Sequence, residues 1–273
     1  MLEMKKLSPM VGAEVLEVDR DRLRHDRDLP GAVLEALEEH GVLVFREIGI
    51  DDEEQVAFGR RLGDLVARPG HPIPEITAIT QDPENPLAEY LRGNLQWHID
   101  GAMDEIPCKA GILSARVMAP GDGATEFAST YAAYDDLTEE EKERFAGYRV
   151  IHALEATLRP VYPNPRPEQL ADWRNRPSRE HPLVWRHRSG RNSLLFGATA
   201  DRVVGLDVEE GRVLLADLVS RATRSERVLR HEWEIGDMVI WDNRGVIHRV
   251  SKYESSSARE LHRVTVAGDE PVE

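Results

Sequence analysis

Residues 236–248 decide the fold: they read Gly-Asp-Met-Val-Ile-Trp-Asp-Asn-Arg-Gly-Val-Ile-His, an apolar strand that runs into a polar turn and ends on a histidine. Short apolar runs bounded by turn residues recur along the chain, and this is typical of strands. The expected strands are 41–45, 76–80, 111–117, 126–128, 149–153, 183–185, 193–196, 238–241 and 261–266. They outnumber the helices and do not alternate with them. The pattern predicts a mainly β fold with flanking helices, closed or double-layered and antiparallel, and argues against a doubly wound parallel sheet.

Helix signals lie beside these strands. Residues 29–40 carry apolar side chains at helical spacing, and residues 51–62 open with Asp51 and Glu54 at the spacing of a capping box. Two further helices are expected to open in the same way, at Thr138 with Glu141 and at Asp207 with Glu210.

Residues 154–182 differ from the rest of the chain because they are polar, rich in proline and without a clear period. A long segment of this kind in a compact domain is usually a functional lid or a disordered loop, so we expect a lid-like insertion here. Apolar segments otherwise recur from residue 11 to residue 267 without a long polar linker. We therefore expect a single catalytic domain over residues 1–273.

Composition excludes several classes of protein. The 273 residues include 50 acidic and 35 basic side chains, for a net charge of -15, whereas nucleic acids and anionic membranes attract basic proteins. No apolar run approaches the length of a membrane span, and the first residues lack the pattern of a signal peptide. The single cysteine, Cys108, has no partner for an internal disulfide and is expected to be a small buried residue. We expect a cytoplasmic protein that binds neither nucleic acid nor membrane.

Three residues suggest a metal site. His98 and Asp100 stand two residues apart, so in an extended segment both side chains project to the same face. A His-x-Asp triplet also arises by chance, but His248 at the end of residues 236–248 supplies a third ligand. Two imidazoles and one carboxylate form the facial arrangement of non-haem Fe(II) oxygenases. A closed structural zinc site would need four ligands, usually including thiolates.

A strand with period two follows. On this reading Arg259, Leu261, Arg263 and Thr265 share one face, and His262 lies on the other. Because burying an unpaired guanidinium is costly, two arginines beside a metal face need an anionic partner. The alternative is that both arginines lie on a solvent face and pair with surface acids. Five further histidines are expected to be structural or surface residues: His152, His181, His187, His231 and His262.

Taken together, these elements resemble a known family. The ordered set is Trp97-His98-x-Asp100, Gly123-x-Thr125-Glu126-Phe127, Trp241-Asp242-Asn243-Arg244 through His248, and then Arg259 and Arg263. It resembles the taurine and 2,4-dichlorophenoxyacetate dioxygenase (TauD/TfdA) family, whose enzymes depend on Fe(II) and 2-oxoglutarate. The likeness runs from the early strand at Gly12–Val15 to Pro271, and eleven residues separate His248 from Arg259, with four more to Arg263.

The resemblance implies a fold and a set of roles. The fold is a double-stranded β-helix, or jelly roll, and relatives are commonly homo-oligomers, either dimers or tetramers. The iron ligands are His98, Asp100 and His248. Thr125 and Arg259 hold the distal carboxylate of 2-oxoglutarate, and Arg263 meets the anionic group of the substrate.

Departures from the taurine branch concern the substrate. Asn94 and Arg263 match residues around the sulfonate and amine of taurine, but Arg68 and His71 stand where that branch has histidine and tyrosine. This puts taurine in doubt, although a pocket with these residues would still favour an anion. Arg68 could equally be a surface arginine beside a turn, and His71 an ordinary loop histidine.

The expected function is hydroxylation of a small organic anion (a carboxylate, sulfonate or sulfate ester) with dioxygen and 2-oxoglutarate, releasing succinate and CO2. The presence of Asp100 separates the chain from halogenating relatives, which have a small residue there. One alternative is a non-catalytic jelly-roll protein that binds a small molecule. A zinc hydrolase with the same three ligands is another, but it leaves Thr125 and Arg259 unexplained.

Overall fold

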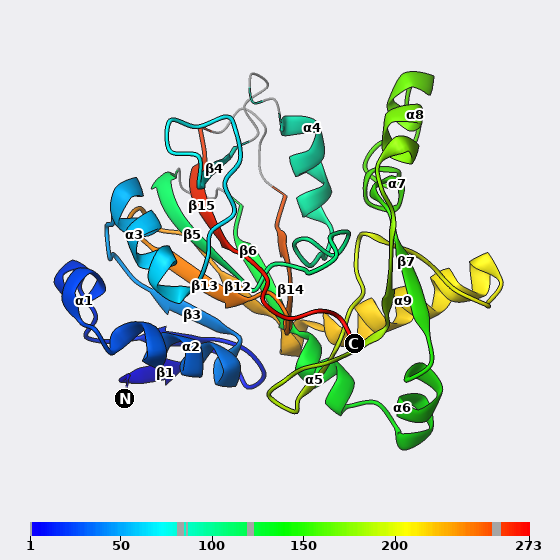
Figure 1. Ribbon diagram of the computed structural model, residues 1–273, viewed down its shortest axis with the longest axis horizontal. Helices are drawn as coiled ribbons and strands as arrows, with labels where there is room; N and C mark the ends of the chain where they lie inside the picture. Colours follow the sequence, from blue (N-terminus) through cyan, green and yellow to red (C-terminus); the bar gives the residue numbers. More distant parts are fainter. Residues whose placement is uncertain (1, 81–84, 86, 119–122, 253–257) are drawn as a thin grey trace.

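A seven-stranded sheet forms the largest layer of the protein (Figure 1). The computed structural model describes residues 2–80, 85, 87–118, 123–252 and 258–273. Within them the strand order is β1-β2-β3-β13-β5-β15-β4, and every pair is antiparallel except β2 with β3. The strands are β1 (Met4–Lys6), β2 (Ala13–Val15), β3 (Val42–Phe45), β13 (Met238–Asp242), β5 (Ala110–Val117), β15 (Glu260–Val266) and β4 (Ile76–Ile79).

The continuous apolar run of β13 is explained by its position at the centre of this sheet. Met238 and Ile240 point into a core beneath helices, whereas Val239 and Trp241 point into a second core between two sheets. All four side chains are buried, so both faces of the strand are covered.

The second sheet has three strands in the order β12-β6-β14. They are β12 (Leu229–His231), β6 (Thr125–Ser129) and β14 (Val246–Val250), and both pairs are antiparallel. Phe127 of β6 packs against Trp241 of β13, with ring centroids 6.0 Å apart. The apolar side chains between the sheets form one continuous core.

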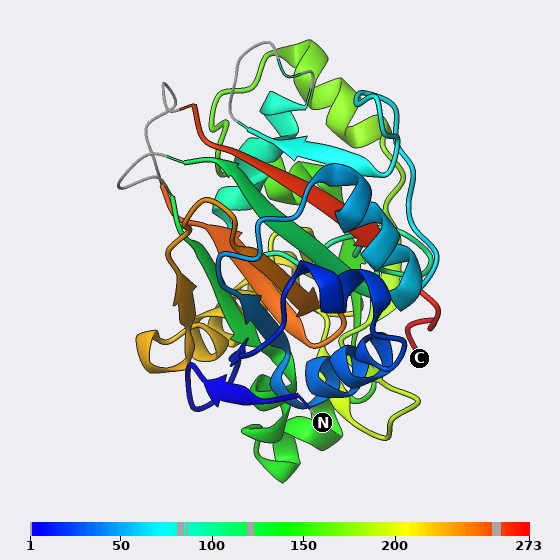
Figure 2. The same ribbon diagram turned by 90° about the vertical axis from the view of Figure 1, so that its left-hand side faces the viewer.

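Three helices cover the outer face of the larger sheet, as Figure 2 shows. They are α1 (Arg20–His25), α2 (Leu29–His40) and α3 (Asp52–Leu62). The expected helices at 29–40 and 51–62 are thus confirmed, and Asp51 and Glu54 form the capping box at the start of α3.

Several of the remaining elements share a third core around Phe145, Leu194 and Leu215. Their helices are α4 (Ala88–Leu91), η1 (Arg92–Leu95), α5 (Thr130–Asp135), α6 (Glu139–Phe145), α7 (Leu154–Leu158), α8 (Pro167–Asn175), α9 (Val208–Ala222) and η2 (Ser225–Arg227). Their strands are β7 (Arg149–His152), β8 (Arg179–Pro182), β9 (Val184–Arg186), β10 (Asn192–Leu194) and β11 (Ala200–Val203). Thr138 and Glu141 form the expected capping box of α6, and Asp207 caps α9.

The fold is mainly β with flanking helices, as predicted, but two local expectations need correction. Residues 154–182 contain α7 and α8 and end in β8, which pairs with β7, so the missing period did not mean missing structure. His248 does not end a turn, because it lies in the middle of β14. None of the helices in the described residues is both long and apolar enough for a membrane span.

Candidate active site

Backbone pairing brings His98 and His248 together across 150 residues of sequence. Each residue's N–H donates to the other's carbonyl oxygen, at 2.9 and 3.0 Å, in an isolated antiparallel bridge. Directly opposed residues in such a bridge project to the same side. The two imidazole rings accordingly lie 4.2 Å apart, centroid to centroid.

Asp100 completes the group. Its carboxylate oxygens lie 3.9 Å from His98 Nε2 and 3.7 Å from His248 Nε2. One nitrogen or oxygen atom from each of the three residues lies within 4.8 Å of the other two. The structure therefore brings the three expected metal ligands to one point.

His98 presents the lone pair that a metal ion needs. His98 Nδ1 lies 2.8 Å from the carbonyl oxygen of Gln96, which accepts the ring N–H, and Nε2 is buried without a hydrogen-bond partner among the described residues. Burial lowers the pKa of both imidazoles, so they remain neutral near pH 7. A buried, neutral, unpartnered imidazole nitrogen facing a carboxylate fits a divalent metal ion.

Asp100 is held in its charged form. Burial alone would raise the pKa of this carboxyl, but Arg263 and the two imidazoles outweigh that effect and hold the pKa well below its usual range. Nη1 of Arg263 donates to both carboxylate oxygens, at 3.1 and 3.0 Å. Arg263 Nε is buried and finds no hydrogen-bond partner in the described part of the chain, which leaves donor capacity for an anion.

Asn243 fixes the backbone on which Asp100 stands. Its Oδ1 accepts from the N–H of Asp100 at 2.9 Å, and its Nδ2 donates to the carbonyl oxygens of Asp100 and Cys108 at 2.8 and 2.9 Å. Sequence reasoning quoted Asn243 within the motif but gave it no role. Its place in the polar turn directly after β13 was the available signal.

Thr125 and Arg259 line the same pocket as His98, His248 and Arg263. Arg259 is only 2% exposed, and its Nε donates to the carbonyl oxygen of Gly123 at 3.1 Å. Thr125 Oγ1 accepts from Trp233 Nε1 at 2.9 Å, a contact that the sequence did not indicate. The solvent-facing alternative for Arg259 and Arg263 is therefore wrong.

Asn94 also lines this pocket, together with the apolar side chains Leu91, Leu113, Trp241 and Leu261. Asn94 belongs to η1, and η1 is held against the segment of residues 154–182 by a hydrogen bond from Gln96 Nε2 to the carbonyl oxygen of Thr157. The pocket thus combines a polar end at the metal group with apolar walls.

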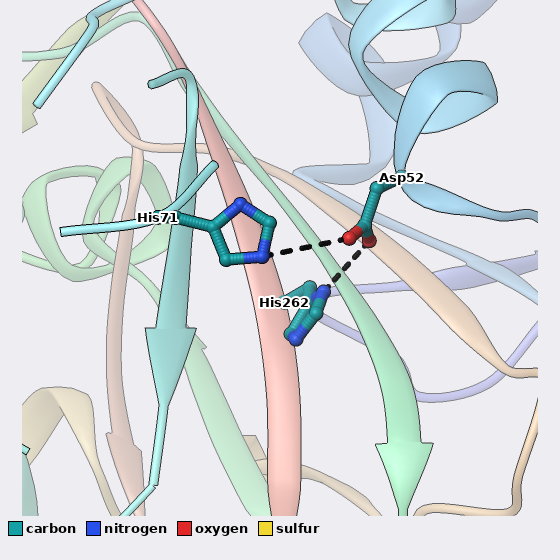
Figure 3. Close-up of side chains that lie close together, drawn as sticks. All are labelled: Asp52, His71 and His262. Atoms are coloured by element: carbon teal, nitrogen blue, oxygen red, sulfur yellow. Dashed lines mark hydrogen bonds and ion pairs between the residues drawn. The ribbon is translucent and has the colours of Figure 1, made fainter. Parts of the chain in front are cut away.

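Arg68 and His71 are not among the residues that line the pocket. His71 lies on the other face of β15, beside Asp52 and His262 (Figure 3), so the structure does not place it near Arg263 as expected. Arg68 is exposed. Burial, reinforced by Asp100, raises the pKa of Cys108 to about 12, although Arg263 opposes the rise.

The other histidines are structural, as expected, since His152, His181, His187 and His231 are all buried outside the pocket. Cys108 is buried, again as expected.

Comparisons with known proteins agree with this geometry. The profile of the taurine catabolism dioxygenase TauD, TfdA family matches residues 3–265. The alpha-ketoglutarate-dependent 2,4-dichlorophenoxyacetate dioxygenase of Burkholderia sp. (strain RASC) is 35% identical over 250 residues, covering 85% of this chain and 83% of that protein. The alpha-ketoglutarate-dependent sulfate ester dioxygenase of Pseudomonas putida is 32% identical over 282 residues, covering 99% and 91%. The crystal structure of AAD-2 in complex with Mn(II) and N-oxalylglycine matches with a TM-score of 0.84 and 31% identity over 100% of both chains.

Proposed function

The chain belongs to the taurine catabolism dioxygenase TauD, TfdA family and is an alpha-ketoglutarate (2-oxoglutarate)-dependent dioxygenase, and from this premise we propose that His98, Asp100 and His248 hold its Fe(II) ion. The observation that carries this assignment is the convergence of two neutral imidazoles and one ionised carboxylate within 4.8 Å of one another. Three ligands on one face leave the other positions for 2-oxoglutarate and dioxygen. Iron with these two cosubstrates supplies the oxidising chemistry that inserts a hydroxyl group and releases succinate and CO2.

Arg259 and Thr125 bind the distal carboxylate of 2-oxoglutarate in this proposal. Both are buried in the wall of the pocket that contains the metal group. A buried guanidinium suits a carboxylate because it offers charge and paired donors in a site from which water is excluded. The hydrogen bond from Trp233 Nε1 fixes the Thr125 hydroxyl and leaves its proton for the cosubstrate.

The substrate is a small organic anion whose charged group meets Arg263. The names of two relatives, a 2,4-dichlorophenoxyacetate dioxygenase and a sulfate ester dioxygenase, describe substrates that differ in shape but share one negative charge. Arg263 has an unpartnered buried Nε, and Leu91, Leu113 and Leu261 provide apolar surface for the rest of the molecule. Asn94 contributes a polar contact at the pocket, and Arg68 adds positive charge at its edge.

The proposal also covers the type of β fold, the domain and its lid. The seven- and three-stranded sheets with a shared core support a jelly roll, and the profile match over residues 3–265 supports a single catalytic domain within residues 1–273. Residues 154–182 support η1 beside the pocket and are proposed as a lid. A homo-oligomer and a cytoplasmic location stay predictions from the resemblance and the single cysteine.

Succinate production tests the proposal with matched pairs of compounds. The iron-loaded enzyme is given 2-oxoglutarate and either an acid, such as 2,4-dichlorophenoxyacetate or an alkyl sulfate, or its uncharged analogue, such as the methyl ester. We expect at least one acid to stimulate succinate formation while its neutral analogue does not, and we expect Arg263→Gln to raise the KM for that acid. Stimulation by neutral compounds alone would contradict the role of Arg263. Binding of small anions without any succinate would favour the non-catalytic alternative.

A further inference from the structure

A second group of possible metal ligands lies on the outer face of β15, opposite Arg263. Asp52 begins α3, His71 stands in the connection between α3 and β4, and His262 belongs to β15. Figure 3 shows the three side chains pointing toward one another. One ligand atom from each lies within 4.8 Å of the other two, as in the iron site. Three segments that are distant in sequence therefore converge on one point.

His262 lies between two carboxylates. Nε2 lies 2.7 Å from Glu260 Oε1, and Nδ1 lies 2.7 Å from Asp52 Oδ1. A neutral imidazole has a single N–H, so it satisfies only one of these carboxylates and turns a lone pair toward the other. When Nε2–H donates to Glu260, the lone pair of Nδ1 faces Asp52, and its only other contact among the described residues is with Arg116 Nε at 3.4 Å. A second proton or a metal ion at Nδ1 would relieve the repulsion between this lone pair and the Asp52 carboxylate.

His71 is arranged in a comparable way. Its Nε2 lies 3.7 Å from Asp52 Oδ2, while its Nδ1 lies 3.2 Å from the carbonyl oxygen of Ile73 and 3.1 Å from the N–H of Ile73. Ile73 can therefore serve either tautomer. The tautomer that donates Nδ1–H to the carbonyl leaves Nε2 free for a metal ion, the outer contact that metal-bound histidines usually make.

The two carboxylate oxygens of Asp52 face different partners. Arg116 Nη2 donates to Oδ1 at 2.8 Å, which leaves Oδ2 turned toward His71. Burial alone would raise the pKa of Asp52, but His262 and Arg116 outweigh it and lower the pKa, so the group is an anion at neutral pH. Arg116 Nε lies 3.4 Å from His262 Nδ1, and this weak contact is the one that a metal ion would replace.

We propose that Asp52, His71 and His262 form a second site for a divalent transition-metal ion, with Zn²⁺ the best fit among the common ions. Two imidazole nitrogens and one carboxylate oxygen suit zinc, and Glu260, Ile73 and Arg116 supply the outer contacts that orient such ligands. The side chains of Asp52 and His71 are each 20% exposed, so water can complete the coordination. Arg116, the arginine at this site, is already paired with Asp52, so we assign the ion a structural task.

That task is to join three segments, of which β15 lines the catalytic pocket. A metal ion here would tie α3 and the connection that carries Arg68 to β15, whose opposite face carries Arg263. Ions that bind only the folded state stabilise it by an amount that grows with the logarithm of their free concentration above the Kd. Zinc should therefore raise the thermal stability of the protein independently of iron.

Zinc binding is tested in the full chain carrying His98→Ala and His248→Ala, which removes the imidazoles of the iron site. After equilibrium dialysis against Zn²⁺, elemental analysis should find one zinc per chain, and zinc should raise the Tm. Adding His71→Ala should abolish both effects. Adding His25→Ala, a change at an exposed histidine, should preserve both.

Two outcomes with these variants would contradict zinc binding at this site. Absence of stoichiometric zinc in the double variant would mean that a proton fills the space beside His262, and zinc retained after His71→Ala would place the ion elsewhere. Should the double variant fail to fold, the otherwise unmodified protein should bind two Co²⁺ ions and its His71→Ala variant only one. Equal binding by these two proteins would overturn the proposal, and neither outcome depends on the proposed oxygenase reaction.

Discussion

At the scale of single residues, the site depends on backbone and side-chain groups that are not ligands. Gln96 sets the orientation of His98 through its carbonyl oxygen, and Asn243 holds the backbone of Asp100. Outer contacts of this kind commonly change metal affinity by about 10- to 100-fold when they are removed. The position of the Asp100 carboxylate in the metal group therefore depends on Asn243.

Asn243→Ala tests this dependence. The substitution leaves the N–H of Asp100 and the carbonyl oxygens of Asp100 and Cys108 without their partner. We expect the Fe(II) affinity, measured by anaerobic titration, to fall roughly 10- to 100-fold. The exposed Asn175→Ala variant is the control and should bind iron normally. An unchanged affinity in Asn243→Ala would show that the loop holds Asp100 without it.

The sequence predicted the residues of the site better than their partners. His98 and Asp100 could be paired because two residues along an extended segment share a face, whereas Asn243 reaches Asp100 across 143 residues. The same limit hid the bond between Trp233 and Thr125, which are 108 residues apart. His71 was misplaced because its loop has no period from which a direction could be read.

At the scale of elements, β15 shows what periodicity can and cannot predict. Its alternation correctly separated Arg263 from His262, because one face lines the pocket and the other meets α3. Periodicity failed for residues 154–182, where the helices are short and largely exposed, so few apolar positions mark them. It also placed His248 in a turn because β14 is a strand of only five residues directly after that turn.

The close approach of β5 and β13 allows a test of the packing between the sheets. A Cβ atom at Gly111 would lie 2.2 Å from the ring of Trp241, whose far end also packs near His248. Gly111→Ala should therefore destabilise the protein by about 1–3 kcal/mol, the usual cost of overpacking a core. Gly31→Ala is the matched control, because its Cβ meets nothing within 4 Å and alanine favours a helix.

Urea unfolding of both glycine variants gives the comparison. We expect a lower midpoint for Gly111→Ala and an equal or higher midpoint for Gly31→Ala. Equal stability of the two variants would mean that the Trp241 ring moves freely, contrary to the packing described here.

At the scale of the whole molecule, buried neutral histidines make stability depend on pH. Burial lowers the pKa of His152 to about 3, and its Nδ1 lies 2.8 Å from Thr199 Oγ1. In the unfolded chain the imidazole takes up a proton as the pH falls below about 6.5, whereas in the folded protein it stays neutral until the pH approaches 3. The contribution of His152 to stability is therefore largest above pH 6.5 and falls as the pH drops toward 3. From pH 7.5 to 5 this residue alone accounts for a loss of about 2 kcal/mol.

His152→Asn should flatten this dependence, since asparagine can bond Thr199 but cannot take up a proton. Urea unfolding of the metal-free proteins at several pH values measures the slope. The variant should lose less stability than the unmodified protein between pH 7.5 and 5, even if it is less stable at pH 7.5. Parallel slopes would contradict a buried neutral His152.

The net charge of the protein and the charge of its pocket have opposite signs. The net charge of -15 predicts a protein that does not bind nucleic acid, but it says nothing about the pocket. Arg259 and Arg263 gather positive charge at the metal group within an acidic protein. Composition averages over the surface, and only the fold reveals a local site of opposite sign.

The central claim is that His98, Asp100 and His248 hold iron beside a 2-oxoglutarate site formed by Thr125 and Arg259. The most direct measurement is the visible spectrum of the purified protein after anaerobic addition of Fe(II) and 2-oxoglutarate. Chelation of the metal by the keto acid should give a charge-transfer band, absent in His98→Ala and weakened in Arg259→Ala at the same 2-oxoglutarate concentration. Absence of the band from the unmodified protein with iron bound, or its persistence at full strength in His98→Ala, would contradict the account.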